Sequence, residues 1–279
     1  MALSSFRSAT SLTNEQIAYY APAVMATEAH DSRSDKYAFI PTIQILKDLS
    51  KEGFYPVQVS QSRTRIADKR AFTKHQVRLR HEGLATPKVG DSIPEIVLVN
   101  SHDGSSGYQI SSGFFRLICA NGMVVGGATQ DIKVRHSGSV SHDVIDGCTR
   151  VLDDLRIAQD RIGTFQGIQL DLAEQQVLAN AAISLRWDAE LAPVVAASVL
   201  RPRRALDLGN DLWTTFNRIQ EALVKGGNRG RGTTGRRLIT RPVEGVSEGI
   251  KLNKALWALA DGMAQIKANL VDVRGLVAA

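Results

Sequence analysis

The chain has 279 residues, of which 43% are hydrophobic and 22% are charged, and its formal net charge is +6. These values are ordinary for a soluble globular protein with one large domain or two smaller ones. Its two cysteines, Cys119 and Cys148, form no CxxC pair, which argues against a zinc ribbon and against a disulfide scaffold.

The sequence also argues against a membrane protein. No stretch approaches the ~18 consecutive apolar residues that a membrane-spanning helix needs. The first residues lack the continuous apolar core of a secretory signal. We therefore expect a cytoplasmic protein without a membrane partner.

The N-terminal part divides into an arm and a core. Residues 1–35 are polar and serine-rich, and we expect an irregular arm there. Residues 36–160 are predicted to form a helix, an antiparallel sheet and a following long helix. The first helix is indicated by apolar residues at helical spacing, with Gly53 as its stop. These apolar residues are Ile40, Ile43, Leu46 and Leu49.

Residues 55–136 change from a helical to an alternating hydrophobic period, which predicts about five antiparallel strands. The pair Asn121-Gly122 lies between two apolar runs and predicts a tight hairpin turn. In one strand Val77 and Leu79 point to one side, so the other side is expected to be exposed and basic. That other side carries Gln76, Arg78 and Arg80.

Residues 161–279 are predicted to be a helical region that contains an Arg/Gly loop at 225–241. Helical periodicity recurs from about residue 141, with Ser141 as a plausible N-cap. The first stripe contains Val144, Cys148, Val151 or Leu152, and Leu155, and later helices are predicted at 172–187, 189–200, 211–224 and 251–266. Trp213 and Trp257 fall on apolar helix faces and are expected in the core. The order of helix, strands and helices indicates the α+β class.

The Arg/Gly loop is the first candidate binding site. It reads KGGNRGRGTTGRRLITR and holds six cations without an acid. Arginine forks suit phosphate oxygens, and glycines let a backbone approach a ligand. The alternative is a solvated surface loop. The candidate residues are Arg229, Arg231, Arg236, Arg237 and Arg241.

A second basic stretch covers residues 63–81, where seven cations accompany only Asp68. Tyr55, Phe72 and His75 lie nearby and could stack on bases. The alternative is an edge hairpin whose charges prevent aggregation. The candidate residues are Arg63, Arg65, Lys69, Arg70, Lys74, Arg78 and Arg80.

A metal or nuclease site is a further alternative. The residues concerned are His102, Asp103, His136, His142 and Asp143. Their spacing matches no HxxxH, HExxH or related signal, so turn and helix-start roles explain the two acids better. We assign no catalytic residue, no metal and no cofactor.

Two segments carry a family resemblance: VNSHDGSSGYQISSGFFRLICANGMVV, and FNRIQEALVKGGNRGRGTTGRRLITRPVEGVSEGIKLNKALWALAD. They resemble the phage/plasmid-like family catalogued as a domain of unknown function, over roughly residues 40–262. This resemblance implies a mobile genetic element but supplies no activity and no site residue. The order of helix, antiparallel meander and long helix is also similar to single-strand annealing proteins of the RecT and Redβ type.

These features lead to one functional expectation and two alternatives. We expect a nucleic-acid-binding protein of a phage or plasmid that holds single-stranded DNA by its phosphates and self-associates into a homo-oligomer. Annealing would follow if the bases stay exposed. The alternatives are an anti-defence protein that meets an acidic host protein, and a metal-dependent nuclease.

Overall fold

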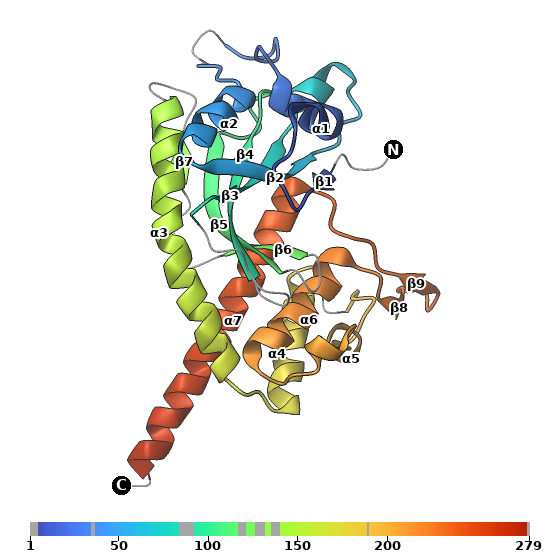
Figure 1. The fold of residues 1–279 in the computed structure, drawn as a ribbon. Coiled ribbons are helices and arrows are strands. Elements are labelled where there is room, and N and C mark those ends of the chain that lie inside the picture. Colours follow the sequence, from blue (N-terminus) through green and yellow to red (C-terminus); the bar gives the residue numbers. More distant parts are fainter. Residues whose placement is uncertain are drawn as a thin grey trace. The chain divides into compact units, whose positions relative to one another are not determined.

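The computed structural model describes residues 5–34, 37–83, 92–116, 121–125, 132–134, 140–188 and 190–277. The chain separates into two compact units, each of which is described by itself (Figure 1). Unit 1 comprises Met1–Arg156 and Glu244–Ser247. Unit 2 comprises Ile157–Val243 and Glu248–Ala279.

Unit 1 is built on an antiparallel sheet in which β2 to β6 follow one another as a meander. The short strand β1 extends the sheet beside β2, and β7 pairs with β5 next to β6. The α+β class and the five-stranded meander expected from the sequence are confirmed. The strands are β1 (Ser5–Arg7), β2 (Phe54–Gln61), β3 (His75–His81), β4 (Ser92–Asn100), β5 (Tyr108–Arg116), β6 (Asn121–Val124) and β7 (Ile132–Val134).

One face of this sheet forms the apolar core of unit 1. A row of partners across four strands consists of Val59, Val77, Leu98 and Ile110, all buried. Helix α2 (Thr42–Lys51) and the first half of α3 (Val140–Gly167) cover this face. A Cβ on Gly147 of α3 would lie 2.6 Å from Ile110, so the helix approaches the sheet closely. The predicted stripe is confirmed by the burial of Val144, Cys148, Val151 and Leu155.

Residues 5–25 of the N-terminal part contain regular elements. Helix α1 (Asn14–Tyr20) begins with a capping box between Thr13 and Gln16, and the 3-10 turn η1 (Pro22–Met25) follows. Leu12 and Ile17 are buried. The expectation of an irregular arm was wrong, because a few apolar residues among many serines suffice to dock this segment on the sheet.

Two local predictions were also wrong. Asn121 and Gly122 lie within β6, opposite Arg116 and Phe115, and are therefore not the turn itself. A Cβ on Gly122 would lie 2.8 Å from Cζ of Arg78, so this glycine makes room for a buried guanidinium. Ser141 is not an N-cap, since α3 already includes Val140.

Unit 2 is helical around an aromatic core. Trp213 stacks on Phe216, and Trp257 meets both rings edge-on and packs against Phe165. Both tryptophans are buried, as expected. The elements are α4 (Leu172–Ser184), α5 (Ala196–Val199), the 3-10 turn η3 (Ala205–Asp207), α6 (Leu212–Lys225), β8 (Arg229–Arg231), β9 (Arg237–Ile239) and α7 (Val246–Val277). Among the described residues, no helix combines the length and apolar character required to cross a membrane.

Candidate nucleic-acid interface

The Arg/Gly segment folds into a β-hairpin made of β8 and β9. Arg229 pairs with Ile239 and Arg231 with Arg237. The tip is the sequence Gly-Thr-Thr-Gly, in which Gly235 has a φ of 75° and donates its N–H to the Gly232 carbonyl at 2.8 Å. Such a φ is accessible to glycine at little cost. Figure 1 shows the hairpin at the margin of the helices of unit 2.

A polar clasp fixes the base of this hairpin. The Asn228 side-chain amide donates to the Ala222 carbonyl of α6 at 2.7 Å and to Thr240 Oγ1 at 3.2 Å. The Thr240 N–H donates to the Asn228 carbonyl at 2.9 Å. Along the outer edge, the Arg231 N–H donates to the Pro193 carbonyl at 2.9 Å. The hairpin is therefore a held element rather than a loose loop.

The hairpin displays an uncompensated positive charge. The side chains of Arg229, Arg231, Arg236, Arg237 and Arg241 belong to exposed residues. None of the five forms an ion pair with a carboxylate in the described part of the chain. Arg231 and Arg237 lie directly opposite each other in the hairpin. Like charges in such positions destabilise an antiparallel pair of strands. An anion lying across the hairpin would relieve that repulsion.

A hollow of about 710 Å³ lies at the base of the hairpin, and we call it the basal groove. It is lined by Ala197, Ser198, Arg201, Pro202, Arg203, Gly227, Asn228 and Arg229, so two separate segments supply three guanidinium groups and no carboxylate. Arg203 is oriented by donating to the Gly226 carbonyl at 2.7 Å and to Asn228 Oδ1 at 3.2 Å. The basal groove is thus a polar and cationic recess.

Two buried acids, Glu221 and Asp207, are bound mainly by Arg204, which does not line the groove. Arg204 binds Glu221 through two bonds of 2.6 and 2.8 Å and also binds Asp207 at 2.8 Å. The hydrogen bond to Glu221 is the main reason that the pKa of Arg204 is raised. Arg203 lies farther from Glu221, at 3.9 Å. Arg201 forms no ion pair with a described carboxylate, so the groove keeps an excess of positive charge.

Sequence reasoning missed Arg201 and Arg203. The run Arg-Pro-Arg-Arg at 201–204 was the available signal, because three cations precede the next acid, Asp207. Of the described residues in the helix predicted at 189–200, only Ala196–Val199 are helical.

The loop between β2 and β3 carries the second cationic surface, in unit 1. Arg63 pairs with Glu244 at 3.2 Å, and Lys74 donates to Ser247 Oγ at 2.8 Å. These two predicted site residues therefore hold the 244–247 segment. Three other cations of this loop form no ion pair with a described carboxylate and remain available to a ligand: Arg65, Lys69 and Arg70.

Arg78 and Arg80 do not form an exposed basic face, which corrects the expectation from alternation. They are 3% and 9% exposed and bind the fully buried Glu95 at 3.2 and 3.1 Å. Arg7 of β1 adds two bonds to the same carboxylate, at 2.7 and 2.8 Å. We call these four residues the Glu95 cluster. Its arginines stabilise the fold and are withdrawn from the candidate interface.

The aromatic residues near this loop give little support to base stacking. His75 is fully buried, and its Nε2 lies 2.8 Å from Thr42 Oγ1 of α2. The ring of Phe72 packs edge-on against the ring of His30. Tyr55 is half-buried and lies opposite Arg80 in the sheet. The expectation that His75 stacks on bases was therefore wrong.

The residues considered for a metal site are dispersed. His102 is buried and lies within 3.3 Å of Thr42 Oγ1, and Asp103 accepts the Ser105 N–H at 2.9 Å in a turn. Asp143 is a first-turn acid of α3, where it lines a small hollow with Asp146, which pairs with Arg150. His136 lies outside the described residues. Within the described ranges, no three His, Cys, Asp or Glu side chains gather as a metal site would require.

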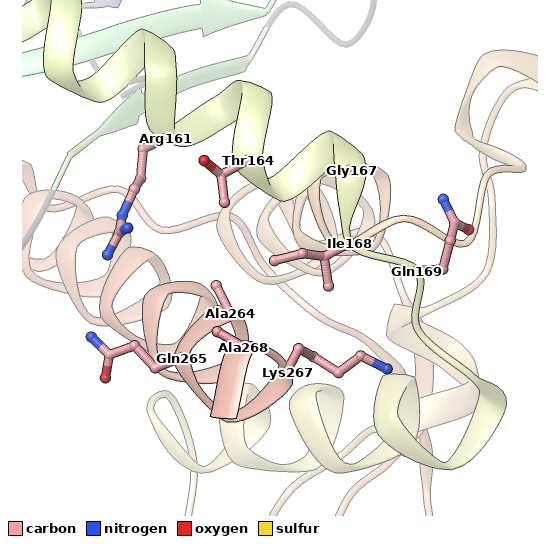
Figure 2. Close-up of a pocket in the computed structure, with 9 residues that line it drawn as sticks. All are labelled: Arg161, Thr164, Gly167, Ile168, Gln169, Ala264, Gln265, Lys267 and Ala268. Atoms are coloured by element: carbon pink, nitrogen blue, oxygen red, sulfur yellow. The ribbon is translucent and has the colours of Figure 1, made fainter. Parts of the chain in front are cut away.

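A second hollow of unit 2, of about 440 Å³, lies between the end of α3 and α7 (Figure 2). Its floor is made of small or apolar residues such as Gly167, Ala264 and Ala268. Its two cations are both paired: Arg161 with Asp261 and Lys267 with Glu174, each at 2.8 Å. This hollow is therefore poorly suited to an anion.

Fold and surfaces together define an α+β protein whose antiparallel sheet is joined to a helical unit that presents a cationic hairpin. A family model described as "Domain of unknown function (DUF932)" matches residues 29–257, and the chain belongs to this family. The resemblance to a family of unknown function is thus confirmed.

Two relatives come from Escherichia coli (strain K12). The UPF0380 protein YafZ is 43% identical over 252 residues, which cover 90% of this chain and 91% of the relative. The UPF0380 protein YfjQ is 43% identical over 250 residues, which cover 90% of each chain. No solved structure matches the chain. The similarity of element order to RecT- and Redβ-type proteins stays a prediction.

Proposed function

We propose that this protein binds single-stranded nucleic acid, DNA above all, through the phosphate backbone. The hairpin arginines form the principal contact, and Arg65, Lys69 and Arg70 of unit 1 form a second one. The setting we propose is a mobile genetic element acting in the cytoplasm, with the protein working as a homo-oligomer. Annealing is the consequence if the bases of the bound strand stay exposed.

One observation carries the proposal: four exposed arginines lie on a clasped hairpin, and Arg241 follows it, all without a described carboxylate partner. A structural role would normally pair such charges, as the Glu95 cluster does in unit 1. Guanidinium groups bind phosphate in a fork, and such contacts hold a backbone without reading its sequence. Binding would release counterions, which makes it salt-dependent.

The test is a variant of the hairpin tip in which Arg231, Arg236 and Arg237 become alanine. Binding to a fluorescent oligothymidylate is measured by anisotropy over a series of salt concentrations. We expect weaker binding and a shallower plot of log K against log salt, by about 0.7 for each phosphate that the protein no longer neutralises. Replacement by lysine should restore part of the affinity, because charge survives while the fork does not.

The matched control removes three exposed lysines outside both surfaces: Lys47, Lys51 and Lys251. It changes net charge equally and should leave the salt slope unchanged. Both variants should keep the thermal midpoint of the wild type, since the substituted side chains are exposed. If both variants lost the same affinity for the oligonucleotide, the loss would be explained by net charge alone and not by the hairpin. A wild type that binds no oligonucleotide at low salt would overturn the proposal and favour an acidic protein as the partner.

A further inference from the structure

We propose that the basal groove is a binding site for a phosphate monoester, such as the 5′-phosphate at the end of a strand or a free nucleoside monophosphate. The hairpin tip meets phosphodiesters along a strand. The groove differs because it is a recess, which suits a terminal group rather than a continuing backbone. This second role is carried by different residues from those of the tip.

The charge of the groove supports a dianion. A phosphate monoester carries about −1.5 to −2 at pH 7, against one negative charge for a diester. Arg201 and Arg229 face the groove from two segments without a described carboxylate partner. Glu221 and Asp207 are engaged mainly by Arg204, and no carboxylate lines the groove itself. A doubly charged group therefore gains more here than a singly charged one.

The geometry of the groove supports a built site. Arg203 is held by Gly226 and Asn228, so one guanidinium is fixed in position before any ligand arrives. Gly227 has a φ of 77°, and a Cβ there would meet nothing within 4 Å. The backbone at this point is open to a ligand's close approach. Ser198 adds a hydroxyl donor to the lining.

The volume of the groove indicates whether the ligand is a phosphate ion alone or a phosphate that carries a nucleoside. About 710 Å³ exceeds what one phosphate needs and is within the ~300–1,000 Å³ of sites for small organic molecules. The groove can thus hold a phosphate with its attached nucleoside. The phosphate would lie among Arg201, Arg203 and Arg229.

The experiment compares one oligothymidylate with and without a 5′-phosphate, and adenosine monophosphate alone as the free source. We expect the wild type to bind the phosphorylated strand about tenfold more tightly, as charge-assisted hydrogen bonds to one added group can supply. Arg201→Ala should abolish this preference and leave binding of the 5′-hydroxyl strand unchanged. The preference should also fall below about pH 6, where the monoester takes up its second proton.

The control is Lys251→Ala, which removes an exposed cation that is not among the lining residues and should keep the preference. The comparison of the two oligothymidylates rests on the proposed function, whereas the measurement with adenosine monophosphate does not. Saturable binding of the monophosphate that Arg201→Ala weakens, in a protein that binds no strand, would support the groove and overturn only the proposed function. Equal affinity for both strands together with no binding of the monophosphate would overturn the inference.

Discussion

Glu95 determines that three arginines have a structural role in the interior of unit 1. It is fully buried and binds guanidinium groups of Arg7, Arg78 and Arg80. Burial would raise the pKa of this carboxyl, but the hydrogen bond and charge of Arg7, with the charges of Arg78 and Arg80, outweigh it and hold the pKa below its ordinary value. Burial in turn lowers the pKa of Arg78 to about 10. Burial of these guanidinium groups is therefore favourable only while the Glu95 carboxylate is there to pair with them.

Glu95→Gln should therefore destabilise unit 1 strongly. Removing one partner of a buried ion pair typically costs about 3–5 kcal/mol, because the remaining charges stay buried. Urea denaturation at pH 7 measures the loss. Glu244→Gln is the control, since it makes the same change in the half-exposed pair with Arg63 and should cost less than about 1 kcal/mol. Similar losses in both variants would contradict this account of the Glu95 cluster.

The same cluster predicts a dependence of stability on pH. Because the pKa of Glu95 is depressed in the folded state, its contribution is present above the unfolded value of about 4.3 and is lost as pH falls through the folded value. The difference in unfolding free energy between wild type and Glu95→Gln should therefore shrink as pH drops from 5 toward 3. A difference that stays constant over this range, measured by urea denaturation, would show that Glu95 does not titrate as described.

Two glycines allow a third prediction at this scale, with an effect of opposite sign at each position. Gly122→Ala should destabilise the protein, because the new Cβ would press on the guanidinium of Arg78 at 2.8 Å. Gly163→Ala should stabilise it by about 0.5–1 kcal/mol, since this helical glycine has open space around it. Thermal unfolding of both variants tests the pair. A stabilising Gly122→Ala would show that Arg78 is free to move aside.

At the scale of the element, the hairpin of β8 and β9 combines a fixed base with a repulsive face. The clasp of Asn228 and Thr240 joins the hairpin to α6, while Arg231 and Arg237 repel each other across the strands. A hairpin of two strands is at best marginally stable by itself. Its order must therefore come from its attachments, which are the clasp and the bond from the Arg231 N–H to the Pro193 carbonyl.

Asn228→Ala should loosen the hairpin without removing any charge. It deletes the bonds to the Ala222 carbonyl and to Thr240 Oγ1, and leaving such buried groups unpaired costs about 1–3 kcal/mol. Hydrogen exchange should become faster in β8 and β9 while the core of α6 keeps its protection. Affinity for an oligothymidylate should fall as well. Thr233→Ala, in the exposed tip, is the control, and faster exchange in that variant would exclude a special role of the clasp.

At the scale of the whole molecule, the two cationic surfaces belong to different units. If one strand contacts both, affinity should rise with oligonucleotide length until both surfaces are engaged, through the effective concentration that the first contact creates. The combined substitution of Arg65, Lys69 and Arg70 by alanine should remove that rise and leave the affinity of short oligonucleotides nearly unchanged. Anisotropy over a length series measures this. A length dependence that survives the substitution would confine binding to unit 2.

Periodicity predicted much of the fold. The change from helical to alternating spacing located the meander, and the apolar faces of α3 and α6 lie where the sequence placed them. Alternation shows which residues share a face of a strand, but it does not show what covers that face. Arg78 and Arg80 were misjudged for this reason, because their acid is 15 to 17 positions away in another strand.

The candidate site was predicted less completely. The hairpin arginines were visible as a run of cations without an acid. The basal groove was not visible, because it combines residues 197–203 with residues 227–229. Only the folded chain brings these segments together, through bonds such as that between Arg203 and the Gly226 carbonyl.

The attachment of β1 also has a consequence for the order in which the chain can fold. Arg7 is synthesised early, but its carboxylate partner lies 88 positions later in the sequence. During translation β1 can pair with β2 once residue 61 has left the ribosome, but Arg7 must wait for its carboxylate until β4 has emerged. Contacts of such long sequence separation slow folding, and an exposed strand edge invites aggregation meanwhile. A solubilising fusion at the N-terminus should shield the waiting segment and raise the yield of folded protein.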